Sequence, residues 1–111
     1  MKPLVSVITV SYNAVSVIER TILSVIGQNY LNLEYIIIDG GSVDGTIDII
    51  KNYQDQISYW ISESDGGIYD AMNKGLLQSK GKWINFMNAG DTFSDMFVLD
   101  NIFSEEMKMW E

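Results

Sequence analysis

An apolar run meets acids and glycines in Tyr35-Ile36-Ile37-Ile38-Asp39-Gly40-Gly41-Ser42-Val43-Asp44-Gly45-Thr46, and this junction sets the organisation of the chain. A continuous apolar run of this length, ended by turn residues, is typical of a strand buried on both faces of a parallel sheet. Asp39 would then lie at the carboxyl end of a central strand, where open α/β sheets bind ligands. The alternative is a loop in which Asp39 and Ser42 only cap a helix.

Strand-like apolar runs alternate with helical periods on both sides of this stretch. The predicted strands cover 4–10, 33–38, 57–61 and 82–87, and the predicted helices cover 15–26, 43–53, 68–78 and 95–110. Ser42 is a candidate N-cap for the second helix. The alternation predicts a three-layer α/β/α fold with a mainly parallel, Rossmann-like sheet of order 3-2-1-4. We expect a single domain over residues 1–111.

Each predicted helix offers an apolar face to the sheet. These faces are Ile18, Ile22 and Val25 in the first helix, Ile68, Ala71, Met72 and Leu76 in the third, and Met96, Leu99, Phe103, Met107 and Trp110 in the last.

The composition limits the chemistry that the chain can carry. Its 111 residues include no cysteine and no histidine, so any general base must be a carboxylate and any metal must be a hard ion such as Mg²⁺ or Mn²⁺. The formal net charge of −8 disfavours nucleic acid as a partner, because phosphate contacts need clustered Lys and Arg. The sequence contains no eighteen-residue apolar run, so we expect no transmembrane helix.

The turn after the first strand does not match the motif required by any of three familiar folds that bind nucleotides or carry signals. A dinucleotide-binding domain needs Gly-x-Gly-x-x-Gly there, whereas the chain has Ser11-Tyr12-Asn13-Ala14. A phosphate-binding P-loop needs Gly-Lys-Ser/Thr, which is absent, and a receiver domain needs an acidic pair at this turn.

Polar residues instead follow each predicted strand and should share one edge of the sheet. They are Ser11, Tyr12, Asn13, Asp39, Asp65, Asn88 and Asp91. Tyr12 can stack on a nucleobase, Asp39 can accept from a ring N–H, and Gly40 leaves room for close approach. Asp91 would be a hard ligand for a cation that carries a diphosphate. The alternative for Asp91 is a helix cap.

Four segments together resemble the family 2 glycosyltransferases, in the order that the family shows them. They are Val5–Asn13 (VSVITVSYN), Ile38–Thr46 (IDGGSVDGT), Gly67–Gly75 (GIYDAMNKG) and Phe86–Asp91 (FMNAGD).

The resemblance implies the inverting, A-type nucleotide-diphospho-sugar transferase fold with Mg²⁺ or Mn²⁺. It implies that Val10, Ser11 and Tyr12 line the base pocket, that Asp39 holds the base, and that Asp44 lies near the same pocket. Asn73 and Lys74 would flank the donor sugar, although a solvated helix face is the alternative. In place of the common Asp-x-Asp-Asp the chain has Asn88-Ala89-Gly90-Asp91. Gly90 therefore stands where relatives have the acid that contacts ribose, and we count it among the residues expected to bind the donor sugar. Asp91 is the acid that the resemblance implies as the metal ligand.

Members of this family usually run to well over twice this length, so we expect the acceptor-binding half and the catalytic base beyond residue 111. Two functions stay open. The first is metal-assisted, inverting transfer of a sugar from a nucleotide-diphosphate donor to a polysaccharide or lipid-linked acceptor. The second is a nucleotide-sugar binding module without turnover. We expect a cytoplasmic protein, either free or peripheral to the inner face of the cell membrane. Apolar surface left uncovered on a half-domain could support a homo-oligomer.

Overall fold

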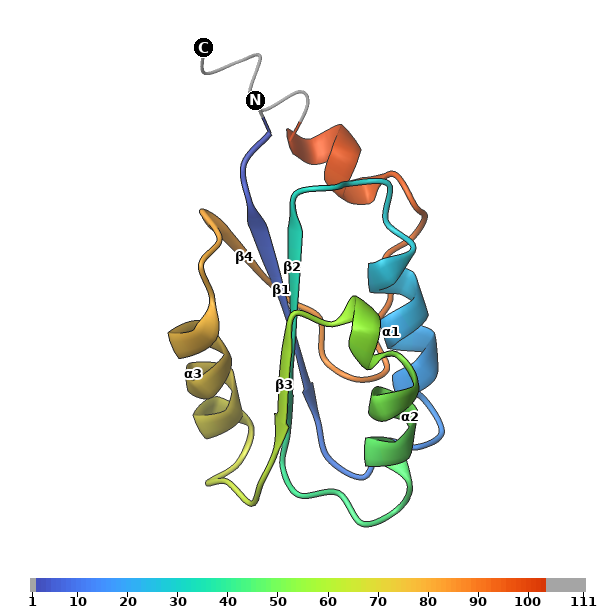
Figure 1. The fold of residues 1–111 in the computed structure, drawn as a ribbon, viewed down its shortest axis with the longest axis vertical. Coiled ribbons are helices and arrows are strands. Elements are labelled where there is room, and N and C mark those ends of the chain that lie inside the picture. Colours follow the sequence, from blue (N-terminus) through green and yellow to red (C-terminus); the bar gives the residue numbers. More distant parts are fainter. Residues whose placement is uncertain (1, 104–111) are drawn as a thin grey trace.

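The chain forms a four-stranded sheet in which every strand pair is parallel (Figure 1). The computed structural model describes residues 2–103. The elements are β1 (Val5–Ser11), α1 (Ile18–Ile26), β2 (Leu33–Asp39), α2 (Thr46–Asn52), the 3-10 turn η1 (Gln54–Gln56), β3 (Tyr59–Ser62), α3 (Ile68–Gln78) and β4 (Trp83–Phe86). A further helical stretch covers 98–103. The strand order β3-β2-β1-β4 confirms the predicted fold.

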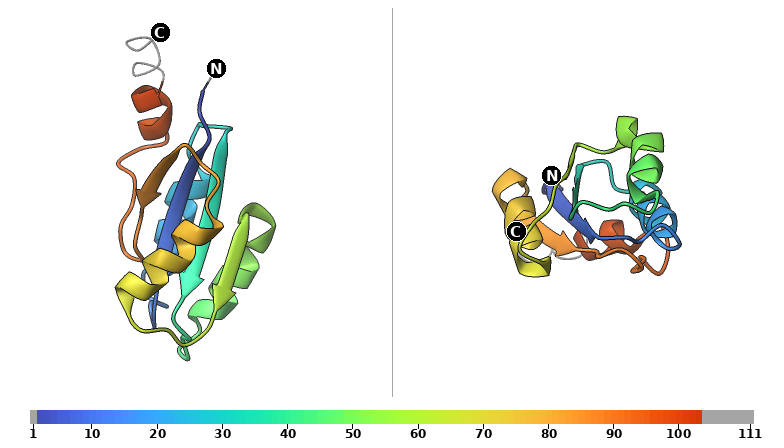
Figure 2. Two further views of the ribbon diagram at one scale, coloured as in Figure 1. Left: turned by 90° about the vertical axis from the view of Figure 1, so that its left-hand side faces the viewer. Right: turned by 90° about the horizontal axis from the view of Figure 1, so that it is seen from below.

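Helices cover the sheet on both faces, which gives the three layers (Figure 2). On one face, Val7 and Ile37 pack with α1, α2 and the helical stretch 98–103. On the other face, Ile8 and Ile36 pack against α3 through Ala71. Because successive strand residues point to opposite faces, an unbroken apolar run is what a strand covered on both sides requires. None of the helices within residues 2–103 has the length and apolar character needed to cross a bilayer.

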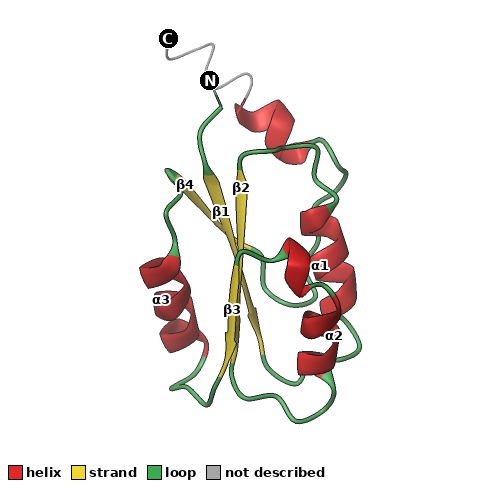
Figure 3. Cartoon of the chain, viewed as in Figure 1, coloured by secondary structure: helices red, strands yellow, loops and turns green. Residues whose placement is uncertain are grey.

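The register of the sheet sets the geometry of its carboxyl edge. Ser11 at the end of β1 is paired with Asp39 at the end of β2, and Asp39 is paired in turn with Ser62 at the end of β3. The loops that follow these strands gather below that edge (Figure 3). Three polar side chains from distant parts of the sequence therefore lie side by side.

Several predicted boundaries were wrong. The first helix begins at Ile18 and not at Val15, and the last described helical stretch begins at 98 and not at 95. The second helix begins at Thr46 and not at Val43, and its N-cap residue is Gly45, with a φ of 107° and no side-chain cap. Ser42 is therefore not the cap, because its hydroxyl is directed to Asp39. The third strand begins at Tyr59 rather than Ile57, since the 3-10 turn η1 occupies part of the link between α2 and β3.

Burial follows the predicted faces closely in α1 and less closely elsewhere. Ile18, Ile22 and Val25 are buried, as are Leu99 and Phe103. Three side chains that were predicted to be buried are exposed instead: Ile68 (49%), Leu76 (41%) and Met96 (51%). Helix α3 buries its small residues Ala71 and Gly75, so its larger apolar side chains flank the contact with the sheet. The predicted burial of Met107 and Trp110 lies outside the described residues.

The close approach of α3 to β1 depends on Gly75. A Cβ at this position would lie 2.5 Å from Ile8 Cγ2, and Ile8 is fully buried. The missing side chain lets the helix lie directly on the sheet, with its N-terminus beside the carboxyl edge.

We expect Gly75→Ala to lower the free energy of unfolding by about 1–3 kcal/mol, because overpacking a buried contact outweighs the helix propensity that alanine adds. Asn73→Ala, at an exposed position of the same helix, is the matched control and should leave stability unchanged or slightly raised. Urea denaturation of both variants measures the difference. Equal stability of the two variants would show that α3 does not lie this close to Ile8.

Candidate functional site

Asp39 is the most heavily hydrogen-bonded side chain at the carboxyl edge. It is 0% exposed. Its Oδ1 accepts from the hydroxyls of Ser11 (2.7 Å) and Ser42 (2.6 Å). Its Oδ2 accepts from the Ser62 hydroxyl (2.8 Å) and from the backbone N–H groups of Ser42 (2.8 Å) and Gly41 (3.1 Å). One carboxylate therefore joins the ends of β1, β2 and β3 to the turn that follows β2.

These donors keep Asp39 ionised despite its burial. Burial alone would raise the pKa of the carboxyl group, but hydrogen bonds from Ser42, Ser11 and Ser62 to the charged form outweigh it. The net result is a pKa below the ordinary value for aspartate. A buried charge of this kind is stable only while its donors stay in place.

The role predicted for Asp39 in holding a base stays a prediction, and the structure shows the surroundings in which Asp39 would act. Its side chain has no exposed surface, and it does not line the cavity at this edge. Both of its oxygens are already engaged by the protein. Asp39 therefore holds together the strand ends that surround the cavity.

A cavity of about 500 Å³ lies at the carboxyl edge between α3 and the strand ends. Its lining residues come from the segments that follow all four strands and from the start of α3. They are Val10, Ser11, Tyr12, Ala14, Gly40, Ser64, Asp65, Gly67, Ile68, Ala71, Asn88 and Ala89. The predicted base-pocket residues Val10, Ser11 and Tyr12 are thus brought together, and Tyr12, at 65% exposure, presents most of its side chain to solvent.

Asp44, one of the predicted nucleotide-binding residues, does not line this cavity. Its Oδ1 accepts from the Thr46 backbone N–H (3.1 Å) and hydroxyl (2.6 Å), and its Oδ2 accepts from the Val15 N–H (3.1 Å). The Thr46 hydroxyl is the main cause that holds the pKa of Asp44 below its usual value. Asp44 therefore links the start of α2 to the loop after β1.

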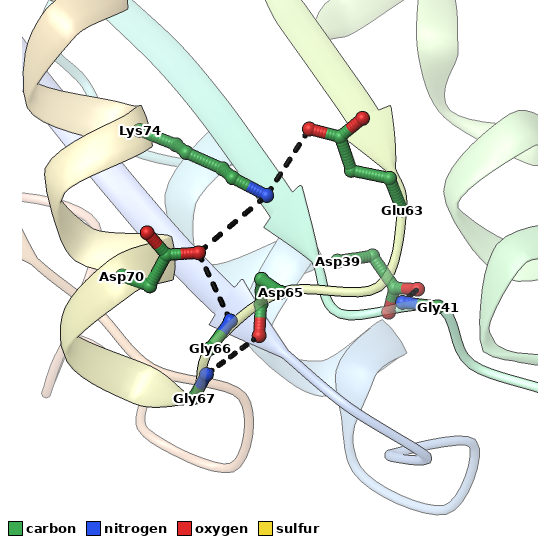
Figure 4. A network of polar contacts seen from close by, with 8 residues as sticks. All are labelled: Asp39, Gly41, Glu63, Asp65, Gly66, Gly67, Asp70 and Lys74. Carbon is green, nitrogen blue, oxygen red and sulfur yellow. Dashed lines mark hydrogen bonds and ion pairs between the residues drawn. The ribbon is translucent and has the colours of Figure 1, made fainter.

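The predicted donor-sugar residues also lie outside the lining. Asn73 is on an exposed face of α3, and its role toward the donor sugar stays a prediction. The Lys74 ammonium lies 3.1 Å from Glu63 Oε1 and 3.7 Å from Asp70 Oδ2 (Figure 4). The hydrogen bond to Glu63 is the main cause that raises the pKa of Lys74. Lys74 thus ties α3 to the segment that follows β3.

Asp65 and Asn88 are functional candidates to which no role was assigned from the sequence. Both line the cavity, and each keeps a buried side-chain oxygen, Asp65 Oδ2 and Asn88 Oδ1, without a hydrogen-bond partner in the described part of the chain. Unpaired buried acceptors are costly, so they commonly mark a place where a ligand or water binds. Their position at strand ends was the available sequence signal, but only the structure shows which acceptors stay unpaired.

Asp91 and Gly90 lie in a turn next to the cavity. The Asp91 N–H donates to the Asn88 carbonyl (2.9 Å), the Gly90 N–H donates to the Thr21 hydroxyl (2.8 Å), and Gly90 has a φ of 104°. The Asp91 side chain is exposed. Within residues 2–103 no three acidic, histidine or cysteine side chains cluster in a way that could hold a metal. The donor set is oxygen-only and fits Mg²⁺ or Mn²⁺ only if the ligand supplies further oxygens.

The lowered pKa of Asp39 predicts a specific pH dependence of stability. At pH 7, Asp39→Asn should lower the free energy of unfolding by about 1–3 kcal/mol, because the amide offers one acceptor oxygen in place of two. The carboxylate contributes its full stabilisation above the unfolded pKa, and loses it as pH falls through the lower folded pKa. The gap between wild type and Asp39→Asn should therefore be constant from pH 7 to about 5 and shrink below about 4.

Thermal unfolding of both proteins from pH 7 to pH 3 measures this gap. Asp55→Asn, a change at an exposed acid in η1, is the control and should track wild type. A gap that stays constant down to pH 3 would rule out stabilisation by the ionised Asp39.

Comparison with known proteins shows which family this chain resembles. Residues 6–102 match the family model "Glycosyl transferase family 2". An uncharacterised glycosyltransferase of Mycobacterium tuberculosis is 43% identical over 93 residues, which cover 83% of this chain and 36% of that protein. The putative teichuronic acid biosynthesis glycosyltransferase TuaG of Bacillus subtilis is 42% identical over 93 residues, covering 81% of this chain and 37% of TuaG. The chain thus spans little more than a third of these relatives.

Solved structures share the fold at lower identity. TarS residues 1–349 from S. aureus, in complex with UDP-GlcNAc, superpose with a TM-score of 0.85 at 23% identity, over 97% of this chain and 32% of that one. The mannosyltransferase PcManGT from Pyrobaculum calidifontis, in complex with GDP-Man and Mn²⁺, gives a TM-score of 0.79 at 23% identity, over 86% of this chain and 30% of that one. With the family model covering most of its length, the chain belongs to glycosyl transferase family 2.

Proposed function

We propose that the cavity at the carboxyl edge binds the nucleoside diphosphate of an activated sugar, and that the protein transfers this sugar with inversion. The observation that carries the proposal is the cavity itself, which places Tyr12, Gly40 and two unpaired acceptors around one space at the strand ends. Ligands of open α/β sheets bind at this edge. Family membership supports the glycosyl-transfer reaction, and solved structures of the same fold hold UDP-GlcNAc or GDP-Man.

The nucleoside end of the donor belongs beside Tyr12 in this proposal. The exposed Tyr12 ring offers a flat surface for a base to stack on, and stacking of this kind contributes about 1–3 kcal/mol per base. Gly40 has no side chain to block the approach, since a Cβ there would lie 3.4 Å from Tyr12 Cδ1. Asn88 Oδ1, the acceptor from the β4 end, suits a hydroxyl of the ribose.

The diphosphate needs positive charge that the lining does not supply. No Lys or Arg is among the described residues that line the cavity, and Lys74 is paired with Glu63 and Asp70. The net charge of −8 makes the need greater. We therefore propose that Asp91 helps to hold Mg²⁺ or Mn²⁺ together with the diphosphate oxygens. A bound cation of this kind neutralises the diphosphate and stabilises it as the leaving group.

The acceptor and the catalytic base are assigned to no described residue. Direct inverting displacement needs a carboxylate within reach of the acceptor hydroxyl. Asp65 is the one acid among the described residues that line the cavity, and it lies close to the groups proposed to bind the nucleobase. We place the base and the acceptor platform after residue 111 of a longer protein, in keeping with the greater length of the relatives. A polysaccharide or lipid-linked acceptor is proposed, and a binding module without turnover is the second candidate.

The metal proposal predicts that Mn²⁺ strengthens the binding of UDP or GDP and leaves the binding of the corresponding nucleoside unchanged. Asp91→Asn should abolish this gain without unfolding the protein, because an amide is a far poorer ligand for a hard cation and the side chain is exposed. Titration calorimetry of the full-length natural chain, with and without Mn²⁺, measures both effects.

Asp95→Asn is the matched control, because Asp95 is a nearby exposed acid whose Oδ1 accepts only from the Phe97 N–H among the hydrogen bonds of the described chain. It should keep the full metal-dependent gain. Retention of that gain by Asp91→Asn would leave Asp91 as a turn residue only. Absence of binding by any nucleoside diphosphate would overturn the proposed function.

A further inference from the structure

We infer that Asn13 and Asp44 are positioning residues for the cavity, because they join the loop after β1 to the loop after β2 and so fix the wall that carries Tyr12. The inference rests on the proposed nucleotide site, and it adds residues that govern the affinity of that site without touching the ligand. Neither Asn13 nor Asp44 lines the cavity.

Residues of the loop after β1 (12–17) alternate between the cavity and the neighbouring loop. Tyr12 and Ala14 line the cavity. Asn13 and Val15 do not line it, and each is hydrogen-bonded instead to the loop after β2 (40–45). Because neighbouring Cα atoms are only about 3.8 Å apart, a shift of Asn13 or Val15 would move Tyr12 and Ala14 with it.

The first inter-loop contact is made by Asn13, through its backbone and its side chain. Its N–H donates to the Ser42 hydroxyl (2.8 Å), and its Oδ1 accepts from the Val43 N–H (2.9 Å). Its φ of 46° lies in the left-handed region, which asparagine tolerates better than most residues. The two hydrogen bonds therefore support an unfavourable backbone conformation, and this conformation turns the chain directly after Tyr12.

Ser42 connects this first contact to the buried charge of Asp39. The Ser42 hydroxyl donates to Asp39 Oδ1 at 2.6 Å and accepts from the Asn13 N–H at 2.8 Å. Asp39 is fully buried and also accepts from the hydroxyls at the ends of β1 and β3. Asn13 is thus attached, through one side chain, to the most heavily hydrogen-bonded group at this edge.

The second inter-loop contact is made by Asp44, two residues further along each loop. Its Oδ2 accepts from the Val15 N–H (3.1 Å), and its Oδ1 accepts from the Thr46 hydroxyl (2.6 Å). The Thr46 hydroxyl in turn accepts from the Ala14 N–H (2.8 Å). A Cβ on Gly45 would lie 3.3 Å from Val15 Cγ2, so the two loops also approach closely here. Asp44 and Thr46 therefore hold the backbone on the far side of the cavity wall.

Tyr12 depends on these contacts because 65% of its side chain is exposed. An exposed ring gains little order from packing, so the backbone on either side of it sets where the ring lies. A wall that is already ordered loses less conformational entropy when a ligand binds. Asn13 and Asp44 should therefore raise the affinity of the cavity by holding Tyr12 in place before the ligand arrives.

The test breaks each contact separately and measures binding of UDP or GDP with Mn²⁺, by titration calorimetry on the full-length natural chain. Asn13→Gly tolerates the positive φ but loses the bond to the Val43 N–H, and Asp44→Asn can accept at only one of its two ends. Each variant should bind roughly 3- to 10-fold more weakly than wild type, the range for one lost hydrogen bond. Asp48→Asn, at an exposed acid in the first turn of α2, is the matched control for Asp44→Asn and should bind like wild type.

The same two changes in a Tyr12→Ala background separate positioning from a general structural role. Tyr12→Ala should itself weaken binding, and each further change should then alter affinity by no more than about 2-fold, the ordinary limit for unrelated changes. Thermal unfolding of every variant identifies those that are folded. Because the two contacts are separate, either variant decides the question if the other does not fold.

Three results would overturn the inference while nucleotide binding by wild type upholds the proposed site. These are wild-type affinity in the folded Asn13→Gly and Asp44→Asn proteins, wild-type affinity in Tyr12→Ala, and a loss of the same size with and without Tyr12. The last result would mean that the contacts act on another part of the cavity. Absence of nucleotide binding in wild type would overturn the proposed function and this inference with it.

Discussion

The carboxylate of Asp39 is the interaction on which the rest of this structure depends. It is a buried negative charge, so it must be matched by donors, and the donors come from the ends of β1 and β3 and from the turn after β2. The parallel register makes this possible, because it sets Ser11 and Ser62 directly beside Asp39. The strand ends cannot separate without leaving the charge uncompensated, so this interaction fixes the strand ends beside the cavity.

Because the protein engages both oxygens of Asp39, the unpaired acceptors at this edge belong to neighbouring residues. Asp65 and Asn88 present unpaired acceptors from loops after β3 and β4, and Tyr12 presents an aromatic face from the loop after β1. Lys74, on α3, is paired with Glu63 and Asp70 and ties the loop after β3 to the helix. The edge is therefore rich in acceptors and poor in free cations. Such a surface suits the hydrogen-bond donors of a nucleoside, and it makes a metal the natural source of charge for a diphosphate.

Much of this was available from the sequence. The layers and the gathering of polar residues at one edge follow from apolar runs that end in turn residues, because parallel strands share a carboxyl edge. Three features were not available. Ser42 matches an N-cap in sequence but donates to Asp39, since a buried charge outcompetes a helix end. Asp39 matches a ligand-binding residue, but its saturation depends on the cross-strand neighbours Ser11 and Ser62. Lys74 lies in a motif, but its side chain turns to Glu63, which is on the separate loop after β3. The Asp39 and Lys74 cases are decided by contacts between distant segments, which local patterns do not encode, whereas the Ser42 contact is local and depends on the burial of Asp39.

The central claim is that Asp39 holds the strand ends together and that the cavity beside it binds a nucleoside diphosphate. A crystal structure of the full-length protein with UDP or GDP and Mn²⁺ tests this most directly. The account predicts a nucleotide in the cavity with its base stacked on Tyr12, while Asp39 keeps its bonds to Ser11, Ser42 and Ser62. A base that donates to Asp39, with the serine bonds broken, would contradict it.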